Sequence, residues 1–271
     1  MKISVIVPTY KPKEYLWECL DSLVAQTLPG SEWELLLVLN GCCEPWRTQI
    51  EQYIGSKMQG MNVVFVQTDT PGVSNARNIA LDRARGEYIT FIDDDDYVSP
   101  QYLEELCSNA SERTISLCYP LSFINGSSDY KEYHITSDYK RNISEKEISY
   151  EKARKYFSGP VYKLIHNNII GNRRFDIKFA NGEDSIFMFL ISDRFEKVRF
   201  TSTHAVYYRR IRQDGASFSK KSICEVIHNQ LRMIGTYTSI YFCHPFSYSA
   251  TFYITRILGA IHGAIEQFRI K

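Results

Sequence analysis

Four consecutive aspartates, Asp93–Asp96, directly follow the apolar segment Tyr88–Ile92. Carboxylates this close repel one another, so the run raises its own pKa values and costs stability unless a cation lies beside it. Carboxylate oxygens suit Mg²⁺ and Mn²⁺, which in turn bridge phosphate groups. A calcium-binding loop is disfavoured because the residues that follow lack its central glycine and closing glutamate. The alternative is a solvated acidic turn ahead of the helix expected from Pro100, where negative charge is favourable.

Polar side chains also stand at the ends of the other apolar segments of the first half. These residues are Pro8, Thr9 and Tyr10 after Ile3–Val7, Asn40 after Leu35–Leu39, and Asp69 after Val63–Val66. Leu16, Leu20 and Leu23 lie at helical spacing between the first two segments. Apolar strands that alternate with helices indicate a parallel sheet covered on both faces, which is an α/β fold. Ligands bind beyond the carboxyl ends of such strands, so a binding crevice is predicted there, and it favours the metal site over a solvated turn.

The second half of the chain is less regular. Residues 129–150 are polar and rich in Tyr, Lys and Ser, which predicts an exposed excursion over the sheet. The segment Asp184–Ile191 is expected to be a helix, and Val198–Thr201 and Ala205–Tyr208 are expected to be short strands. Earlier in the chain, a helix that begins at Ser74 is expected to use this residue as its cap.

The C-terminal part of the chain is apolar but interrupted. No formally charged residue lies between Arg232 and Arg256, yet Pro245 and many hydroxyl side chains make this stretch too polar for the ~20 apolar residues of a membrane-spanning helix. Further on, one helical face carries apolar residues, namely Ile254, Ile257, Leu258, Ile261, Ile265 and Phe268. Such a stripe usually marks burial, so packing on the domain or on a second subunit is favoured over an interfacial helix at a membrane surface.

Composition excludes several classes of protein. With 271 residues, 44% of them hydrophobic and 23% charged, the chain can bury a sizeable core and is neither disordered nor fibrous. Its net charge of +1 and the lack of a continuous basic stripe disfavour a nucleic-acid partner. Seven cysteines without CxxC or zinc-ligand spacing, and an N-terminus without a signal-peptide segment, favour reduced thiols in the cytoplasm.

The order and spacing of these pieces resemble the family 2 glycosyltransferases over residues 1 to about 215. The segments that carry the resemblance are Val5–Tyr10 with the helix Tyr15–Thr27, Glu34–Gly41, Gly72–Asn78, Gly86–Ile89, Phe91–Asp96, Gly159-Pro160 with Lys163-Leu164, Phe175-Asp176 and Gly182–Asp184. The resemblance implies a GT-A fold, with a Rossmann-like, mostly parallel central sheet flanked by helices. The implied domains are a glycosyltransferase domain at 1–220, divided into a nucleotide-sugar-binding half at 1–120 and an acceptor-binding half at 121–220, and a C-terminal helical extension at 221–271.

The resemblance also implies a donor site. Its residues would be Pro8, Thr9 and Tyr10 along the nucleotide, Asn40 and Asp69 at the base or ribose, Arg77 over the donor sugar or phosphates, Asp93 at the ribose or donor sugar with Asp94 beside it, and Arg210 and Ser217 over the diphosphate. Asn40 stands where the family usually has an aspartate, and its amide still offers a donor and an acceptor to a uracil edge. A structural salt bridge with the aspartate run is the alternative role of Arg77.

The same match implies the catalytic residues. Asp95 matches the second aspartate of the family's Asp-x-Asp motif and would ligate Mn²⁺ or Mg²⁺, whose charge would neutralise the leaving diphosphate. Asp184 matches the general base that takes the proton of the acceptor hydroxyl, and its alternative role is to cap the helix that follows. Asp96 would begin the helix after the aspartate run. A single base and direct displacement imply inversion at the anomeric carbon.

The sequence thus predicts an inverting, metal-dependent glycosyltransferase in surface polysaccharide biosynthesis, with a UDP-sugar donor and a glycan or lipid-linked saccharide acceptor. It would be cytoplasmic, and its C-terminal helices would contact the inner membrane face or form a homodimer. A sugar-nucleotide pyrophosphorylase is disfavoured because no glycine-rich loop follows the first strand. A catalytically inactive nucleotide-sugar-binding scaffold protein is disfavoured because Asp93, Asp95 and Asp184 are all present.

Overall fold

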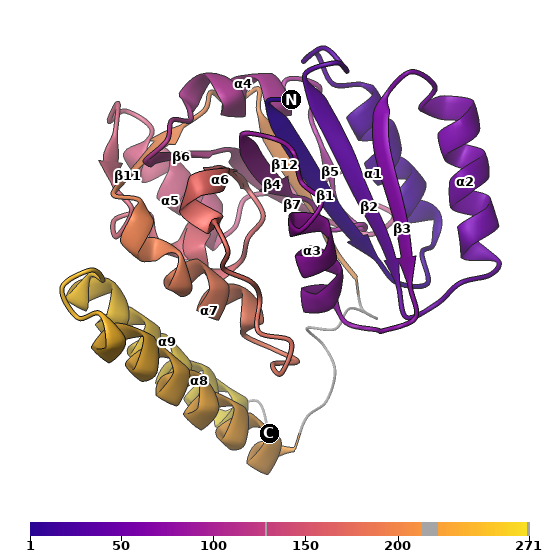
Figure 1. The fold of residues 1–271 in the computed structure, drawn as a ribbon. Helices are drawn as coiled ribbons and strands as arrows, with labels where there is room; N and C mark the ends of the chain where they lie inside the picture. Colours follow the sequence, from indigo (N-terminus) through magenta and orange to yellow (C-terminus); the bar gives the residue numbers. More distant parts are fainter. Residues whose placement is uncertain (128, 213–221, 270–271) are drawn as a thin grey trace.

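The structure is a computed structural model and describes residues 1–127, 129–212 and 222–269. Within them, a central sheet of eight strands has the order β3-β2-β1-β4-β10-β6-β11-β9 (Figure 1). The strands are β1 (Ile3–Thr9), β2 (Trp33–Asn40), β3 (Asn62–Thr68), β4 (Tyr88–Phe91), β6 (Thr114–Leu117), β9 (Ile148–Ser149), β10 (Lys163–His166) and β11 (Lys197–Phe200). The strands β3, β2, β1 and β4 pair in parallel, whereas β10 is antiparallel to both of its neighbours. The predicted α/β class with a mostly parallel sheet is confirmed.

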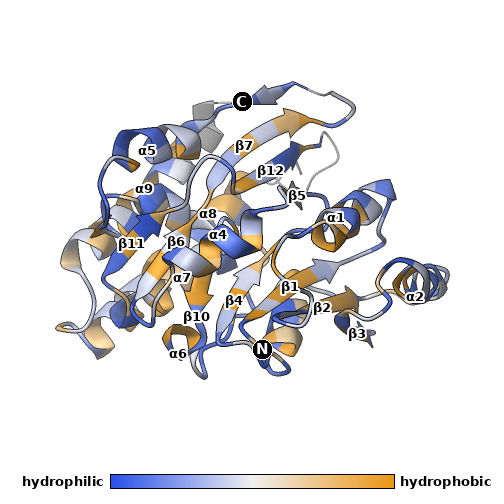
Figure 2. Cartoon of the chain, turned by 90° about the horizontal axis from the view of Figure 1, so that it is seen from above, coloured by the Kyte–Doolittle hydropathy of each residue, from blue (hydrophilic) through white to orange (hydrophobic). Residues whose placement is uncertain are grey.

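Apolar strand interiors make this sheet the core of the molecule. Every residue of β1 and β2 is buried, and Figure 2 shows hydrophobic residues concentrated in β1 and β10. In Figure 1, α3 lies in front of the sheet and α1 lies behind it, so helices cover both faces. The helices of this half are α1 (Glu14–Val24), α2 (Trp46–Lys57), α3 (Val73–Leu81) and α4 (Tyr102–Asn109). The parallel pairing brings the carboxyl ends of the first four strands to one edge, as predicted.

The start of α3 differs from the prediction. The helix begins at Val73, and its N-cap is Gly72 with a φ of +126°. Only glycine adopts such a backbone conformation readily, which allows the chain to turn directly from the preceding loop into the helix. Ser74 is therefore inside the first turn and is not the cap. Its hydroxyl is buried and has no hydrogen-bond partner among the described residues.

A second, smaller sheet joins the two halves of the chain next to the aspartate run. Its order is β5-β12-β7-β8, and its strands are β5 (Tyr97–Val98), β7 (Tyr119–Ile124), β8 (Tyr130–Lys131) and β12 (Val206–Ile211). The short strands predicted near 198–201 and 205–208 are confirmed as β11 and β12. The prediction of an exposed excursion over 129–150 is wrong for α5 (His134–Asn142). This helix buries Ile135 and Tyr139, because the Tyr139 ring packs edge-on against Phe200.

The remaining helical elements lead to a C-terminal hairpin of two long helices. Before it come η1 (Arg154–Ser158), α6 (Asn167–Ile170), α7 (Glu183–Leu190) and η2 (Ser192–Arg194). The hairpin consists of α8 (Ile223–Cys243) and α9 (Ala250–Arg269), and it lies against α7 (Figure 1). The Phe252 ring of α9 is fully buried among the rings of Tyr150, Phe157 and Phe189. The predicted packing of a C-terminal helix on the domain is confirmed, while the domain boundaries at 120 and 220 stay predictions.

Most of the apolar stripe predicted on the last helix does not pack on the domain: Ile254, Leu258, Ile261 and Ile265 are exposed, whereas Ile257 is partly buried against the core. The side chain of Phe268 lies outside the part of the chain that the structure describes. The large apolar side chains of the hairpin that remain exposed are Ile227, Leu231, Phe242, Phe246, Ile254, Leu258, Ile261 and Ile265. We call these residues the outer hairpin face, because on α9 they lie opposite the buried Phe252. The stripe was expected to be buried, and the domain instead contacts the more aromatic side of the helix. No helix within the described ranges has the length and apolar character needed to cross a bilayer.

Candidate active site

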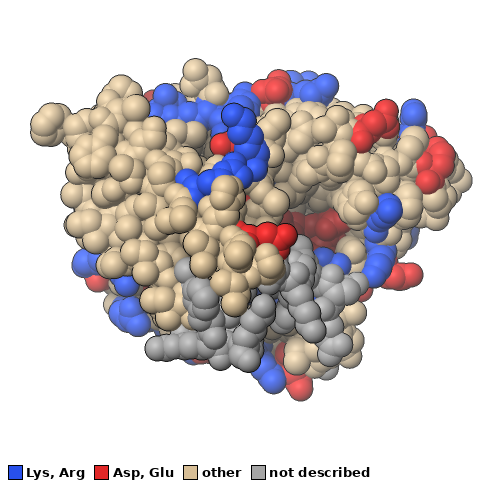
Figure 3. All heavy atoms as spheres, turned by 90° about the horizontal axis from the view of Figure 1, so that it is seen from below, with Lys and Arg blue, Asp and Glu red and all other residues tan. Residues whose placement is uncertain are grey.

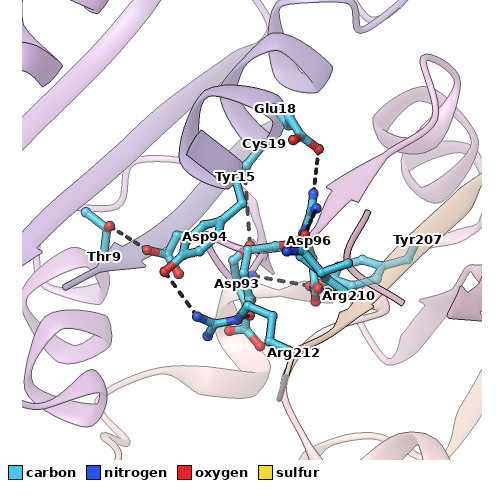
Figure 4. Close-up of polar contacts among 12 residues, drawn as sticks. Thr9, Tyr15, Glu18, Cys19, Asp93, Asp94, Asp96, Tyr207, Arg210 and Arg212 are labelled. Atoms are coloured by element: carbon cyan, nitrogen blue, oxygen red, sulfur yellow. Dashed lines mark hydrogen bonds and ion pairs between the residues drawn. The ribbon is translucent and has the colours of Figure 1, made fainter. Parts of the chain in front are cut away.

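The aspartate run forms one turn between β4 and β5, at the edge where the parallel strands end. The amide of Asp96 donates a hydrogen bond to the carbonyl of Asp93 over 3.1 Å, which closes the turn. Each of the four carboxylates then meets a different partner from another element, as Figure 4 shows for several of them. Figure 3 shows acidic side chains inside a hollow of the surface.

Asp96 anchors the turn to the smaller sheet. It is 4% exposed, and its carboxylate accepts hydrogen bonds from the Tyr207 hydroxyl at 2.8 Å and from the amide of Arg210 at 2.7 Å. Burial, together with the other carboxylates of the turn, raises the pKa of Asp96 well above its usual range. The prediction that Asp96 begins the next helix is wrong, because α4 begins only at Tyr102.

Asp94 lies against the end of β1. The Thr9 hydroxyl donates to its carboxylate over 2.5 Å (Figure 4), and burial raises the pKa of Asp94 to about 7 although this hydrogen bond opposes the shift. Pro8 and Thr9 are buried in the strand, whereas Tyr10, the next residue, is 50% exposed. The structure therefore brings Thr9 to the aspartate turn and leaves the Tyr10 ring at the surface, where a planar base could stack.

Asp95 is paired with an arginine that the sequence prediction missed. Arg212 Nε donates to the Asp95 carboxylate over 2.6 Å, and its guanidinium carbon lies 4.7 Å from the centre of the Tyr15 ring. Burial and the neighbouring Asp93 raise the pKa of Asp95, so additional positive charge near this carboxylate is favoured. Ser217, the other candidate of this segment, lies outside the described residues.

Arg210 is buried and forms hydrogen bonds to other elements of the protein. It is 7% exposed, and its guanidinium donates to Glu18 at 2.5 Å (Figure 4). It also donates to the Asn125 side chain and to the carbonyl of Asp95, each at 2.7 Å. These bonds tie β12 to α1 and to the aspartate turn. The alternation Arg210-Ile211-Arg212 at the end of β12 marks Arg212 as a second candidate, but it does not reveal the pairing with Asp95.

Arg77 on α3 joins the aspartate turn to α7. Its guanidinium is 3% exposed and forms ion pairs with Asp93, at 3.0 Å from Nη2, and with Asp184, at 2.5 Å from Nη1. The Phe175 ring covers it at 5.3 Å. The salt bridge considered as the alternative role of Arg77 is therefore present. Contact between Arg77 and a nucleotide sugar stays a prediction. Because Arg77 is buried and Asp93 is partly exposed, Asp93 lies between the guanidinium and the solvent.

Asp184 lies in the first turn of α7, two residues after the N-cap Gly182. Its side chain is 29% exposed, and no side chain caps this helix, so the alternative role of Asp184 as a cap is not observed. Burial raises the pKa of Asp184, and Arg77 opposes the rise. The adjacent Glu183 is buried and has a pKa raised to about 7 by burial and by Asp184. A partly exposed carboxylate with a raised pKa is suited to accept a proton.

Lys163 is a buried cation to which the sequence analysis assigned no role. It is fully buried on β10, and its ammonium donates to the carbonyls of Gly159 and Val161, each at 2.6 Å. Burial lowers the pKa of Lys163 to about 7. A side chain added at Gly159 would lie 4.0 Å from Asp184 Oδ2, so Lys163 fixes the loop that faces the candidate base. The sequence signal that could have identified Lys163 is the presence of a lysine within an apolar strand segment.

Asn40 and Asp69 stand at the ends of β2 and β3. Asn40 is 4% exposed, its amide nitrogen donates to the carbonyl of Thr9 at 2.8 Å, and its oxygen accepts from the amide of Gly72 at 2.9 Å. These bonds fix the distance between β1 and the start of α3, and a uracil base would have to share them. Asp69 is exposed and accepts from Gln67 at 2.8 Å. The contacts of both residues with a base or ribose stay predictions.

The chemistry of Asp93 and Asp95 fits a divalent cation that arrives with a phosphate ligand. Arg77 and Arg212 each bond one oxygen of these carboxylates, which leaves an oxygen of each for a metal. No group of three His, Cys, Asp or Glu side chains within the described ranges forms a complete protein cage. Mg²⁺ is commonly held by one or two carboxylates together with substrate phosphates, so this donor set is sufficient for such an ion.

Comparisons with known proteins agree with the resemblance. The sequence model of the family "Glycosyl transferase family 2" matches residues 4–180. Poly(ribitol-phosphate) beta-N-acetylglucosaminyltransferase TarS of Staphylococcus aureus is 36% identical over 112 residues, which are 41% of this chain and 19% of TarS. Glycosyltransferase GlyA of Streptococcus pneumoniae is 30% identical over 231 residues, which cover 80% of this chain and 31% of GlyA. The chain therefore spans about a fifth to a third of the length of these relatives.

A solved structure extends the similarity to the fold. The crystal structure of S. aureus TarS 1-349 in complex with UDP-GlcNAc has a TM-score of 0.69 and 25% sequence identity, and it covers 89% of this chain and 67% of that one. The family match includes the strand ends, Arg77 and the whole aspartate turn, and it stops shortly before Asp184. The chain belongs to the family 2 glycosyltransferases and has their GT-A fold.

Proposed function

We propose that this chain is an inverting glycosyltransferase that moves a sugar from a UDP-sugar to a hydroxyl of a glycan or lipid-linked acceptor, in the biosynthesis of a surface polysaccharide. The observation that carries the proposal is the arrangement of Asp93 and Asp184 around the buried guanidinium of Arg77. This arrangement brings Asp93, a candidate contact of the nucleotide sugar, and Asp184, the candidate base, to one crevice. TarS, which by its name acts on poly(ribitol phosphate) and whose structure holds UDP-GlcNAc, supports this class of donor and acceptor.

Asp184 is the proposed general base. The acceptor oxygen would attack the anomeric carbon and pass its proton to the Asp184 carboxylate, while the bond between that carbon and the diphosphate oxygen breaks. A single base and a single displacement invert the configuration at the anomeric carbon. Burial raises the pKa of Asp184, which makes its carboxylate a stronger proton acceptor. The ion pair with Arg77 opposes this rise and favours the ionised form of the carboxylate.

The donor would lie along the strand ends and the aspartate turn. Thr9, Tyr10 and Asp69 would line the nucleotide, because they stand at the carboxyl ends of neighbouring parallel strands. A Mn²⁺ or Mg²⁺ ion held by Asp95 would supply Lewis-acid neutralisation of the diphosphate when bound, and Asp93 would contact the ribose or the donor sugar. Arg212 beside Asp95 adds fixed positive charge at the same place.

The substitution Asp184→Asn tests the base. Transfer from UDP-GlcNAc or UDP-glucose is expected to fall about 10²- to 10⁴-fold because the proton acceptor is lost. UDP affinity in calorimetry is expected to stay near wild type. In the wild type, the rate should fall as the pH drops through the raised pKa of Asp184, so the acid limb lies above the ordinary carboxyl value of about 4. Asp82→Asn, an exposed acid paired with Arg174, is the matched control, and an active Asp184→Asn enzyme would remove the base assignment.

The substitution Arg77→Met tests the link between the two carboxylates. The free energy of unfolding in urea is expected to fall by about 3 kcal/mol, the lower end for a buried ion pair because both carboxylates are partly exposed. The acid limb of the pH–rate profile should move to higher pH, since Arg77 lowers the pKa of Asp184. Arg83→Met is the control, because Arg83 is exposed and donates to the carbonyl of Ile79. An unchanged profile would show that the ion pair has no part in the reaction.

Calorimetric titration of UDP, GDP and dTDP, with and without Mn²⁺, tests the donor half. We expect UDP to bind most tightly, Mn²⁺ to strengthen its binding, and Asp95→Ala to remove the effect of Mn²⁺. Asp21→Ala, which removes an acid on α1 that bonds Tyr53, should retain that effect. Preference for another nucleotide would contradict the uridine assignment, and unchanged dependence on Mn²⁺ in Asp95→Ala would contradict the metal ligand. No binding of any nucleotide would favour a scaffold protein.

We also propose that the outer hairpin face lies on a membrane that carries the lipid-linked acceptor, with the protein on the cytoplasmic side. This face joins exposed apolar side chains of both helices, and no formally charged residue lies between Arg232 and Arg256. Figure 3 shows a broad area with few charged side chains, over α8 and α9 on the left, on the same side of the molecule as the acidic hollow. A sugar presented at the bilayer surface would therefore face the proposed active site.

Sedimentation with vesicles of phosphatidylglycerol and phosphatidylethanolamine tests the membrane contact. The wild type is expected to pellet with the vesicles, and the double variant Leu231→Glu/Leu258→Glu is expected to remain in the supernatant because charge opposes insertion. Ile177→Glu, at a singly exposed isoleucine outside the hairpin, should pellet like the wild type. A dimer in analytical ultracentrifugation that the double variant breaks, without any vesicle binding, would assign the face to a second copy of the chain.

A further inference from the structure

Ser185, the residue after the proposed base, is the point where the C-terminal hairpin meets α7. Its hydroxyl oxygen accepts a hydrogen bond from the Tyr237 hydroxyl of α8 at 2.8 Å and another from Arg256 Nη1 of α9 at 3.0 Å. A hydroxyl oxygen has two acceptor lone pairs, so both are used by the hairpin. Two helices from the end of the chain thus hold the backbone position directly beside Asp184.

Arg256 is a mostly buried cation that donates hydrogen bonds to neutral groups. Its guanidinium is mostly buried, lies 4.4 Å from the centre of the Phe252 ring, and donates from Nη2 to the carbonyl of Arg154 at 2.9 Å. Within the described ranges no carboxylate acts on its pKa, and Nε is buried without a hydrogen-bond partner. Burial lowers the pKa of Arg256 to about 10. The guanidinium is held by the hydroxyl of Ser185, the carbonyl of Arg154 and the Phe252 ring, which fixes it beside the first turn of α7.

The hairpin also holds the chain on the other side of the base. Gly182 has a φ of +87°, and a side chain there would come within 2.4 Å of Met233 Sδ, so α8 packs directly on this turn. Asn229 Nδ2 donates to the carbonyl of Asn181 at 3.2 Å. The residues on both sides of the proposed base are therefore fixed by α8 and α9.

We propose that Arg256 and Tyr237 are positioning residues for Asp184 and act through the hydroxyl of Ser185. This inference rests on the proposed function of Asp184 as general base. The two donors hold the first turn of α7 so that the carboxylate stays paired with Arg77 and aimed into the crevice. Neither Arg256 nor Tyr237 reaches the aspartate turn. Binding of the nucleotide sugar should therefore be independent of these two residues.

Steady-state kinetics of UDP release from UDP-GlcNAc, with water as acceptor, tests the proposal. Arg256→Met and Ser185→Ala are each expected to lower kcat about 10- to 100-fold, because a displaced base loses its geometry. The KM for UDP-GlcNAc and the affinity for UDP should stay near wild type. The double variant Arg256→Met/Ser185→Ala should be no slower than either single variant, because the effects of two residues that act through one contact do not add. Arg256→Lys, which keeps one donor, should recover part of kcat.

Matched variants separate the possible outcomes. Arg232→Met, which removes an arginine of α8 that covers Phe179, should leave kcat unchanged. If Asp184→Asn retains kcat, the proposed function of the base fails, whatever Arg256 does. If Asp184→Asn is inactive while Arg256→Met and Ser185→Ala keep wild-type kcat, the positioning role is overturned. Additive losses in the double variant, or a parallel loss of UDP affinity, would show a general structural role instead and would also overturn it. Should Arg256→Met fail to fold, Ser185→Ala and Arg256→Lys decide by the same criteria.

Discussion

The buried guanidinium of Arg77 is the interaction on which the rest of the site depends. A desolvated cation requires opposite charge close by, and its two partners come from different parts of the chain. Asp93 belongs to the turn after β4, and Asp184 belongs to the first turn of α7. Because one cation serves both, it holds the turn after β4 and the first turn of α7 together, and loss of Arg77 would leave both carboxylates without this cation. The short helix α3, which starts at Gly72, places Arg77 beneath the strand ends where both carboxylates can reach it.

Four adjacent aspartates are tolerated because the fold separates their environments. One carboxylate is neutralised by Arg77, one is bonded by a threonine hydroxyl, one is paired with Arg212, and the last is buried against β12. The turn therefore works as a junction between the two sheets as well as a candidate ligand site. Burial raises the pKa of Asp94, Asp95 and Asp96, which opposes the ionisation of all three together. A divalent cation beside the turn would favour the ionised carboxylates.

The strands, most helices and the edge of the sheet that carries the polar residues could be predicted, because hydrophobic periodicity is a local property. Contacts between distant residues could not. The pairing of Arg212 with Asp95 depends on the register of β12 against β5 and β7, which no short segment reveals. Likewise, Leu258 belongs to an apolar stripe that the sequence assigns to burial, but the domain contacts the opposite side of α9 at Phe252. The sequence favours Ser74 as a cap, but Gly72, two residues earlier, takes that place with a positive φ.

The close contact between Gly182 and Met233 limits which residues can stand at these two distant positions. Any side chain larger than hydrogen at 182 would collide with the sulfur of Met233, and the positive φ adds strain for any other residue. A residue other than glycine at 182 would therefore strain the backbone and force the end of the Met233 side chain to move. A hairpin taken from another protein would likewise have to leave room for this turn at the position of Met233.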